Sequence, residues 1–319
     1  MKRIAVLTSG GDAPGMNAAI RAVTRVGIYR GLEVVGIRRG YEGLLEGDAI
    51  PLTQSSVGGI IHHGGTILRT ARSERFKRSE GVTEGFTRLK EMDVDALVVI
   101  GGEGSFKGAW ELEKRGFPTV GVPGTIDNDC AGTDETIGYD TAVNTALEAV
   151  KKLRDTASSH DRLFIIEVMG RNSGFIALQV ALAGGAECVL LPEVPLDVEK
   201  VCQKLNYAKR RGKTHSLIIV AEGVMSAQEL AGKILDTGGY ESRITVLGHI
   251  QRGGSPTAFD AVLGSRLGAH AVEALLGGKS GVMAGVTCGQ VTTCPLPETW
   301  ENKKRPDLSL LELLNALSI

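Results

Sequence analysis

Short runs of Val, Ile and Leu alternate with longer amphipathic segments along this chain, and that alternation limits the possible folds more than any other feature. Continuous apolar runs are typical of strands buried on both faces of a parallel sheet, and the segments between them have the period of covering helices. At the start, Ile4–Thr8 is apolar, a glycine-rich turn follows, and an amphipathic segment from Met16 ends at Gly31. The sequence therefore predicts an α/β fold with mainly parallel sheets and helices on both faces.

Further runs have the character of strands. They are Val34–Ile37, Ala96–Ile100, Thr119–Val122, Leu163–Val168, Cys188–Leu191, Ser216–Ala221, Ile244–Gly248 and the weaker Val286–Val291. The longest amphipathic segment begins at Tyr139. A length of 319 residues exceeds what one hydrophobic core usually supports, which favours two domains. No low-complexity linker separates them, so we infer a boundary near Gly138 from the start of the long helix.

Composition excludes several classes of protein. With 36 basic and 37 acidic residues the net charge is -1, so no general attraction to nucleic acid is expected and any anion site must be local. Five cysteines without a CxxC pair favour free thiols in a reducing compartment, which predicts a cytoplasmic protein. The N-terminal apolar run is too short for a signal peptide, and no stretch approaches a membrane span.

Glycine-rich or polar turns follow several of these strands: SGGDAPG, GGEGSFKG, PGTIDND, EVMGRNSG, AEG and GHIQRGG. The carboxyl ends of strands converge on one crevice in a doubly wound fold, so we pool the side chains of these turns as one predicted site. The pool holds Asp12, Glu103, Asp127, Asp129, Glu222, Arg171, His249 and Arg252. Carboxylates, arginines and bare backbone amides suit phosphoryl groups bridged by a divalent cation.

The PGTIDND turn has the strongest catalytic character, because Pro-Gly ends a strand and exposes Thr125, Asp127 and Asp129 in a loop. Carboxylates two residues apart can face the same way, so one can act as a base while the other attracts a metal ion. The alternative is an acidic turn that caps the next helix, since Asp and Asn favour turns for local reasons.

The GGEGSFKG turn opens a helix, so its amides and the helix dipole can hold a polyphosphate while Glu103 offers oxygen to Mg²⁺. It matches neither a P-loop nor GxGxxG, and the alternative is a plain glycine turn. No His/Cys group has zinc spacing, and no GxSxG elbow is present. Arg171 and Arg252 stand at strand ends and point to the predicted crevice, whereas a lone histidine such as His249 is more often structural.

Seven blocks in this order, SGGDAPGMN, TARS, GGEGS, PGTIDND, VMGR, AEG and HIQRGG, resemble bacterial ATP-dependent 6-phosphofructokinases over nearly the whole chain. The resemblance implies two Rossmann-like lobes. An ATP-binding lobe would comprise residues 1–138 and 251–305, and a sugar-phosphate-binding lobe residues 139–250 and 306–319. It also implies a cytoplasmic glycolytic homotetramer that phosphorylates the 1-hydroxyl of fructose 6-phosphate, with active sites shared between subunits.

The resemblance assigns roles residue by residue. ATP would contact Gly11, Arg72, Ser73, Gly102, Glu103, Gly104, Ser105 and Gly108, and Mg²⁺ would bind Glu103 and Asp129. Asp127 would act as the catalytic base, and Thr125, Arg171 and Arg72 would be the other catalytic residues. Fructose 6-phosphate would contact Thr125, Ile126, Asp127, Met169, Gly170, Arg171, Glu222, His249, Ile250, Gln251 and Arg252, with Arg162 and Arg243 from a neighbouring subunit.

An effector site for ADP, which activates the family, and phosphoenolpyruvate, which inhibits it, is implied as well. Its residues would be Arg21, Ala22, Val23, Thr24, Arg25, Arg154, Gly185, Ala186, Glu187, Arg211, Lys213, Thr214 and His215. The basic residues around Lys213 are otherwise a solvated helix end.

The chain departs from the family pattern at several positions. Glu103 replaces an aspartate, and the longer side chain changes the reach to Mg²⁺. Gln54 and Gly59 replace an Arg and an Asp beside the effector pocket, and Asp161 replaces a Glu before the sugar-phosphate arginine. We therefore expect a weaker allosteric response than is usual in the family.

Rival functions differ in testable ways. A pyrophosphate-dependent relative would carry GGDDS and PKTIDND, whereas this chain has Gly104 and Gly124. A nicotinamide oxidoreductase would need the Rossmann fingerprint and its ribose-binding acid, which the sequence lacks. A sugar-phosphate sensor without activity stays open because of Glu103.

Overall fold

The computed structural model describes residues 1–160 and 162–318, so Asp161 lies outside the described residues. The chain forms two compact units. Unit 1 comprises Met1–Ile126, Cys130–Thr141 and Arg252–Lys304, and unit 2 comprises Asp127–Asp129, Ala142–Gln251 and Arg305–Ile319. The sequence prediction placed residues 127–129 in the first lobe, whereas the structure groups them with unit 2.

The sheet of unit 1 has the order β11-β10-β5-β4-β1-β2-β3. Its strands are β1 (Arg3–Thr8), β2 (Glu33–Ile37), β3 (Ala49–Leu52), β4 (Ala96–Gly101), β5 (Thr119–Pro123), β10 (Val282–Thr287) and β11 (Gln290–Pro295). The central strands are parallel, and each edge strand pairs antiparallel with its neighbour. β1 and β4 are almost wholly buried because helices cover both faces of the sheet.

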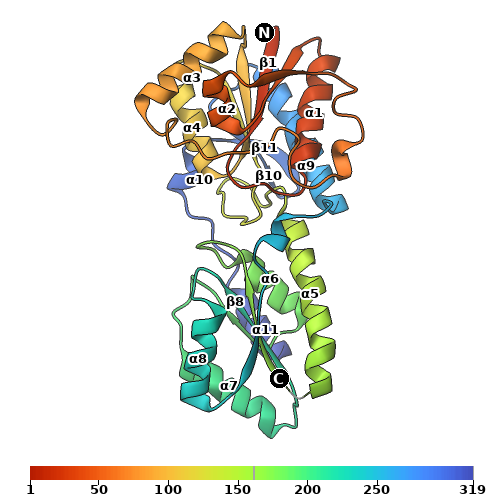
Figure 1. Ribbon diagram of the computed structural model, residues 1–319, viewed down its shortest axis with the longest axis vertical. Coiled ribbons are helices and arrows are strands. Elements are labelled where there is room, and N and C mark those ends of the chain that lie inside the picture. Colours follow the sequence, from red (N-terminus) through yellow and green to blue (C-terminus); the bar gives the residue numbers. More distant parts are fainter. Residues whose placement is uncertain (161, 319) are drawn as a thin grey trace. The chain divides into compact units, whose positions relative to one another are not determined.

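Helices α1 (Met16–Tyr29) and α9 (Ala258–Leu276) cover one face of this sheet (Figure 1). They pack closely because α9 presents glycine there: a Cβ on Gly268 would lie 2.6 Å from the Ala19 carbonyl oxygen. The other face carries α2 (Gly40–Glu46), α3 (Ser79–Glu91) and α4 (Glu103–Glu113). The short η1 (Ile60–His62) and α10 (Glu298–Glu301) complete the unit.

Unit 2 has a parallel sheet in the order β7-β8-β6-β9. The strands are β6 (Leu163–Val168), β7 (Cys188–Leu190), β8 (Ser216–Ala221) and β9 (Ser242–Val246). Helices α7 (Val198–Arg210) and α8 (Ala227–Gly238) cover one face, and Figure 1 shows α5 (Tyr139–His160), α6 (Phe175–Gly184) and α11 (Ser309–Leu317) on the other. The short η2 spans Gly248–Arg252.

The α/β class with mainly parallel sheets is confirmed, as are most of the predicted strands. The prediction of one strand over Val286–Val291 is wrong, because Cys288 and Gly289 form a turn between β10 and β11. β9 ends at Val246, and the prediction that it runs to Gly248 is also wrong, since η2 begins there. The edge strand β3 was not predicted, because Pro51 argues against a strand except at a sheet edge.

Candidate active site

In unit 1 the turns after β1, β4 and β5 meet, because these three strands are neighbours in the sheet. The Ser9 amide donates to the Ile100 carbonyl at 2.9 Å, and the Gly124 amide donates to the Gly101 carbonyl at 2.9 Å. A Cβ on Gly102 would lie 3.7 Å from the Thr125 Cβ, so the two predicted loops lie side by side with room for little more than a methyl group between them. The sheet order thus brings predicted ATP and catalytic residues together.

Glu103 lies in the first turn of α4, directly after the capping residue Gly102. Its carboxylate pairs with Lys107 one turn later, and the two side chains are about half exposed, at 46% and 51%. An acidic group in the first turn of a helix is stabilised by the helix dipole. The loop therefore offers exposed amides and an exposed carboxylate whose present partner is a flexible lysine.

Tyr41 supports this loop and was not singled out in the sequence, although it follows the end of β2. Its hydroxyl donates to the Ser105 carbonyl at 2.6 Å, and burial raises the pKa of the phenol, which therefore stays a neutral donor. The ring stacks on Phe76 with centroids 4.1 Å apart. A Cβ on Gly108 would lie 2.8 Å from the Tyr41 ring, so glycine at 108 admits this ring.

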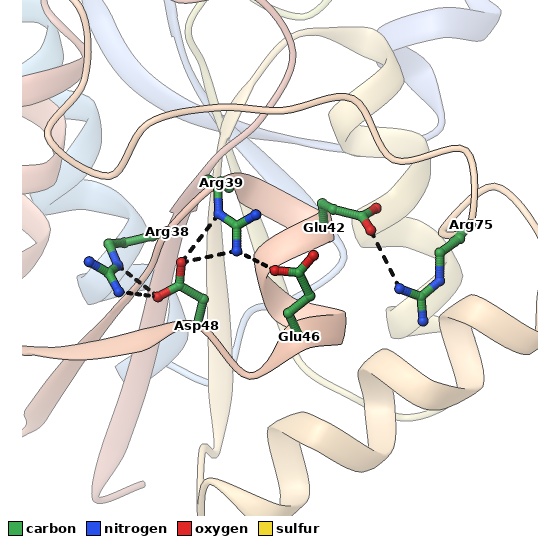
Figure 2. Close-up of polar contacts among 6 residues, drawn as sticks. All are labelled: Arg38, Arg39, Glu42, Glu46, Asp48 and Arg75. Carbon is green, nitrogen blue, oxygen red and sulfur yellow. Dashed lines mark hydrogen bonds and ion pairs between the residues drawn. The ribbon is translucent and has the colours of Figure 1, made fainter.

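A group of ion pairs fixes the short helix that carries Tyr41. Figure 2 shows its members: Arg38, Arg39, Glu42, Glu46, Asp48 and Arg75. Asp48 follows α2 and accepts hydrogen bonds from Arg38 Nε at 2.7 Å and Arg39 Nε at 3.3 Å, both from residues that precede α2. Arg75 pairs with Glu42 at 3.4 Å. This contact ties α2 to the segment that holds the exposed Arg72 and the half-buried Ser73.

Arg252 lies against the turn after β1. Its Nη1 donates to the Asp12 carbonyl at 3.2 Å, and a Cβ on Gly11 would lie only 2.1 Å from that nitrogen. A predicted sugar-phosphate residue therefore touches a predicted ATP turn within unit 1. His249 and Ile250 belong to unit 2 and are exposed.

In unit 2, Asp127 and the loop after β6 come together. The Asp127 side chain is buried, and its Oδ2 lies 3.9 Å from Nε of Arg171, whose side chain is 64% exposed. Glu222, at the end of β8, accepts hydrogen bonds from the amides of Arg171 at 2.8 Å and Gly170 at 3.3 Å. Since Gly170 and Arg171 both have positive φ, the Glu222 carboxylate holds a backbone turn that few residues adopt.

Two further groups fix the same loop. The Ser173 hydroxyl hydrogen-bonds to the carbonyls of Asp127 at 3.0 Å and Gly170 at 2.9 Å. Gln251 is fully buried, and its Oε1 accepts from the Met169 amide at 2.9 Å. Gln251 was predicted as a substrate residue, whereas Ser173 was missed although it lies in the predicted EVMGRNSG turn.

Arg162 and Arg243 lie at the other end of the unit 2 sheet. Arg162 directly precedes β6, and Arg243 pairs with Phe164 near the amino ends of β9 and β6. The six residues of β6 separate them from the Met169–Ser173 loop, which at about 3.3 Å per residue is roughly 20 Å. These two arginines and Arg171 therefore lie at opposite ends of the unit 2 sheet.

The predicted effector residues fall into two groups. Arg21, Ala22, Val23, Thr24 and Arg25 lie on α1 in unit 1. The others belong to unit 2. There Arg154 Nη2 donates to the Gly184 and Gly185 carbonyls at 2.5 Å, and Lys213 pairs at 2.7 Å with Glu187, which is buried. Gln54 lines a cavity of about 940 Å³ beside β3, together with mainly apolar residues.

Within residues 1–160 and 162–318, no three His, Cys, Asp or Glu side chains lie close enough to hold a metal ion by themselves. Glu103, in the first turn of α4, nevertheless offers the kind of ligand that Mg²⁺ uses, since proteins usually bind this ion through one or two carboxylates plus substrate phosphates. In the same described part of the chain, no helix combines the length and apolar character needed to cross a membrane.

Comparison with known proteins shows the family to which this chain belongs. The family description Phosphofructokinase matches residues 3–275. The ATP-dependent 6-phosphofructokinases of Listeria welshimeri and Halalkalibacterium halodurans are each 56% identical to this chain over 319 residues, covering 100% of both sequences. The structure of phosphofructokinase from Saccharomyces cerevisiae is similar, with a TM-score of 0.88, 34% identity and coverage of 100% of this chain and 48% of that one. The chain therefore belongs to the phosphofructokinase family.

Proposed function

We propose that this chain is an ATP-dependent 6-phosphofructokinase, which transfers the γ-phosphoryl group of ATP to the 1-hydroxyl of D-fructose 6-phosphate. The products are ADP and fructose 1,6-bisphosphate, in a committed step of glycolysis. The observation that carries the proposal is the buried Asp127 carboxylate, 3.9 Å from the Arg171 guanidinium, directly after a turn that contacts the predicted ATP loop. Full-length relatives of 56% identity bear this activity in their names.

ATP is assigned to unit 1. The contact residues would be Gly11, Arg72, Ser73, Gly102, Glu103, Gly104, Ser105 and Gly108. The bare amides at the start of α4 suit a polyphosphate, because helix amino termini attract anions. Gly124 supports ATP over pyrophosphate, since a Cβ there would already lie 2.9 Å from Met16 Cε and 3.1 Å from Ile100 Cγ2. The lysine of pyrophosphate-dependent relatives would need both side chains to move.

Asp127 is assigned as the general base. Its carboxylate would accept the proton of the fructose 1-hydroxyl as that oxygen attacks the γ-phosphorus and the bond to ADP breaks. Thr125 and the Arg171 guanidinium, with Arg72, would stabilise the negative charge on the transferred group. Phosphoryl transfer depends mainly on positioning and charge stabilisation, and the base contributes a smaller share.

The sugar phosphate is assigned to Met169, Gly170, Glu222, Gln251 and the sequence neighbours His249, Ile250 and Arg252. Arg162 and Arg243 would act on the site of another subunit, since their place at the amino ends of β6 and β9 separates them from Arg171 in their own chain. We therefore propose a homotetramer with shared active sites. The composition supports a cytoplasmic location.

Mg²⁺ is proposed to bind through Glu103 and Asp129, and when bound it would neutralise charge on the phosphates. The effector residues on α1, with Arg154, Glu187 and Lys213 of unit 2, are proposed to bind ADP and phosphoenolpyruvate. Gln54 and Gly59 carry no charge where relatives have an Arg and an Asp, so phosphoenolpyruvate should inhibit only weakly.

A coupled assay of ADP release tests the proposal, with ATP, Mg²⁺ and fructose 6-phosphate as reactants. We expect ADP release that depends on the sugar phosphate, and no formation of fructose 1,6-bisphosphate when pyrophosphate replaces ATP. Sugar-phosphate binding without ADP release would instead identify a sensor and refute the kinase assignment.

A further inference from the structure

Asp260 is a fully buried carboxylate in the first turn of α9 that accepts hydrogen bonds from the start of another helix. Its Oδ1 accepts from the Gly138 amide at 2.8 Å, and its Oδ2 accepts from the Thr141 amide at 2.8 Å and the Thr141 hydroxyl at 2.6 Å. The Thr141 amide is one of the leading N–H groups of α5, which have no acceptor within the helix itself. Asp260 thus fixes where the segment before α5 lies.

That segment in turn holds the end of β5. The Ile137 amide donates to the Pro123 carbonyl at 2.9 Å, and the Thr125 amide donates to the Ile137 carbonyl at 3.1 Å. The Thr136 hydroxyl donates to the Thr125 carbonyl at 2.6 Å. Both the amide and the carbonyl of Thr125 are therefore held by residues 136–137, which lie directly before the Asp260 contacts.

The turn after β1 rests on the same segment. Gly138 has a φ of 101°, and a Cβ at this position would lie 2.6 Å from the Ala13 Cβ. A Cβ on Gly15 would lie 2.7 Å from Ile137 Cγ2 and 3.1 Å from the Asp260 carbonyl oxygen. A movement of residues 136–138 would therefore also displace the turn that contains Gly11 and Asp12.

We propose that Asp260 is a positioning residue for phosphoryl transfer, which sets the places of Thr125 and of the Gly11–Gly15 turn through residues 136–138. It touches neither substrate in this proposal. Its effect is to hold two loops that follow neighbouring strands in one relative position. The kinetic part of the inference rests on the proposed function.

Asparagine at 260 keeps the shape but removes an acceptor oxygen, so its amide group would face the N–H and O–H donors of Gly138 or Thr141. The segment would then have to shift to satisfy these donors. Small misplacement of reacting groups can lower a rate by about 100-fold. We expect Asp260→Asn to lower kcat by about 10- to 100-fold while the KM for each substrate changes much less.

Glu113 provides a matched control. Its carboxylate also accepts a threonine amide and hydroxyl, from Thr119 at 2.8 Å and 3.1 Å, and a third hydrogen bond from Ser280 at 2.7 Å. Glu113 is the last residue of α4, and its partner Thr119 begins β5, at the end of that strand away from Thr125. We expect Glu113→Gln to leave kcat within about twofold of wild type. Equal kcat values for the Asp260 and Glu113 variants would overturn the proposal.

Thr141 gives a second test that keeps the Asp260 carboxylate in place. Thr141→Ser retains the hydroxyl that donates to Asp260, whereas Thr141→Val removes it at nearly the same size. We expect a lowered kcat in the valine variant and restoration in the serine variant. Indistinguishable kcat values in the two would contradict a role that acts through this hydrogen bond.

Hydrogen exchange provides a readout that needs no activity. The amides of Thr125 and Ile137 should exchange at least about tenfold faster in Asp260→Asn and Thr141→Val than in wild type, and be unchanged in Glu113→Gln. If the wild-type protein released no ADP, the proposed function would be wrong. Hydrogen exchange would still test whether Asp260 holds the segment around Thr125 and Ile137. Unchanged exchange at both amides would refute the positioning role itself.

Discussion

Replacing Asp260 by asparagine should change the way that stability depends on pH. Burial, with a smaller contribution from the nearby Asp140 carboxylate, raises the pKa of this carboxyl from its ordinary value of 3.8 to about 6, although hydrogen bonds from Thr141 and Gly138 act in the opposite direction. The folded protein therefore binds this proton more tightly than the unfolded chain does. Stability from this group is present below pH 3.8 and is lost as the pH rises through about 6.

The size of the effect follows from the two pKa values. A difference of about 2 units corresponds to about 3 kcal/mol over the whole range, at 1.36 kcal/mol per unit. About 1.3 kcal/mol of this loss in the free energy of unfolding occurs between about pH 5 and pH 7. Urea unfolding is practical in this range. Asparagine does not titrate, so the Asp260→Asn variant should lack this part of the slope.

Urea unfolding of both proteins at several pH values measures the difference directly. We expect the free energy of unfolding of wild type, relative to the variant, to fall by about 1.3 kcal/mol from about pH 5 to pH 7. Subtracting the two curves removes contributions from groups that titrate alike in both. A difference that stays constant, or that rises with pH, would show that Asp260 is not held as a buried charge.

Other changes test the site and its supports. Asp127→Ser should lower kcat by roughly 10² to 10⁴, the usual share of a general base, with melting temperature little changed; full activity would remove Asp127 from the mechanism. Gly11→Ala should displace the Arg252 guanidinium, because its Nη1 would lie only 2.1 Å from the new Cβ. We expect the KM for fructose 6-phosphate to rise by about tenfold, since hydrogen bonds to charged groups contribute about 1.5–3 kcal/mol. An unchanged KM would mean that Arg252 does not bind the phosphate. Asp48→Asn should lower the urea midpoint at neutral pH but hardly at all under strongly acidic conditions. Hydrogen bonds from Arg38 and Arg39 lower the pKa of Asp48. The contribution of Asp48 to stability is therefore present above pH 3.8 and is lost as the pH falls below that value. Saturation curves for fructose 6-phosphate should move little with phosphoenolpyruvate, and a many-fold shift would contradict the weak response expected from the two replacements beside the effector pocket.

The sequence predicted the turns of the site because their position depends on a general property of the fold. Apolar runs marked β1, β4 and β5, and parallel strands place their carboxyl ends at one edge of the sheet. The hydrogen bond from the Gly124 amide to the Gly101 carbonyl follows from the neighbouring positions of β4 and β5. Local patterns were enough here, since the residues that carry chemistry lie directly after the strands.

Local patterns failed where the chain breaks a local preference. Cys288 has a φ of 50° and Gly289 a φ of 76°, and two residues of positive φ make the tight turn that joins β10 to β11. Cysteine rarely marks such a turn, so the sequence VTCGQV was interpreted as one strand. Pro51 likewise argues against a strand, and only the edge position of β3 tolerates it.

The groups that hold the turns in place were beyond prediction for a different reason. Asp260 bonds Gly138 and Thr141, which are 122 and 119 residues away, and an acidic residue in the first turn of a helix has an ordinary local explanation. Only the structure shows that this carboxylate is buried, at a cost to stability of about 3 kcal/mol at neutral pH. A fold that keeps such a cost in the contacts that hold the segment bonded to Thr125 behaves as expected of strain stored at a functional site. Many acidic residues lie in the first turn of a helix, where they are usually exposed. The burial of its carboxylate is therefore the physical feature that distinguishes Asp260 from them.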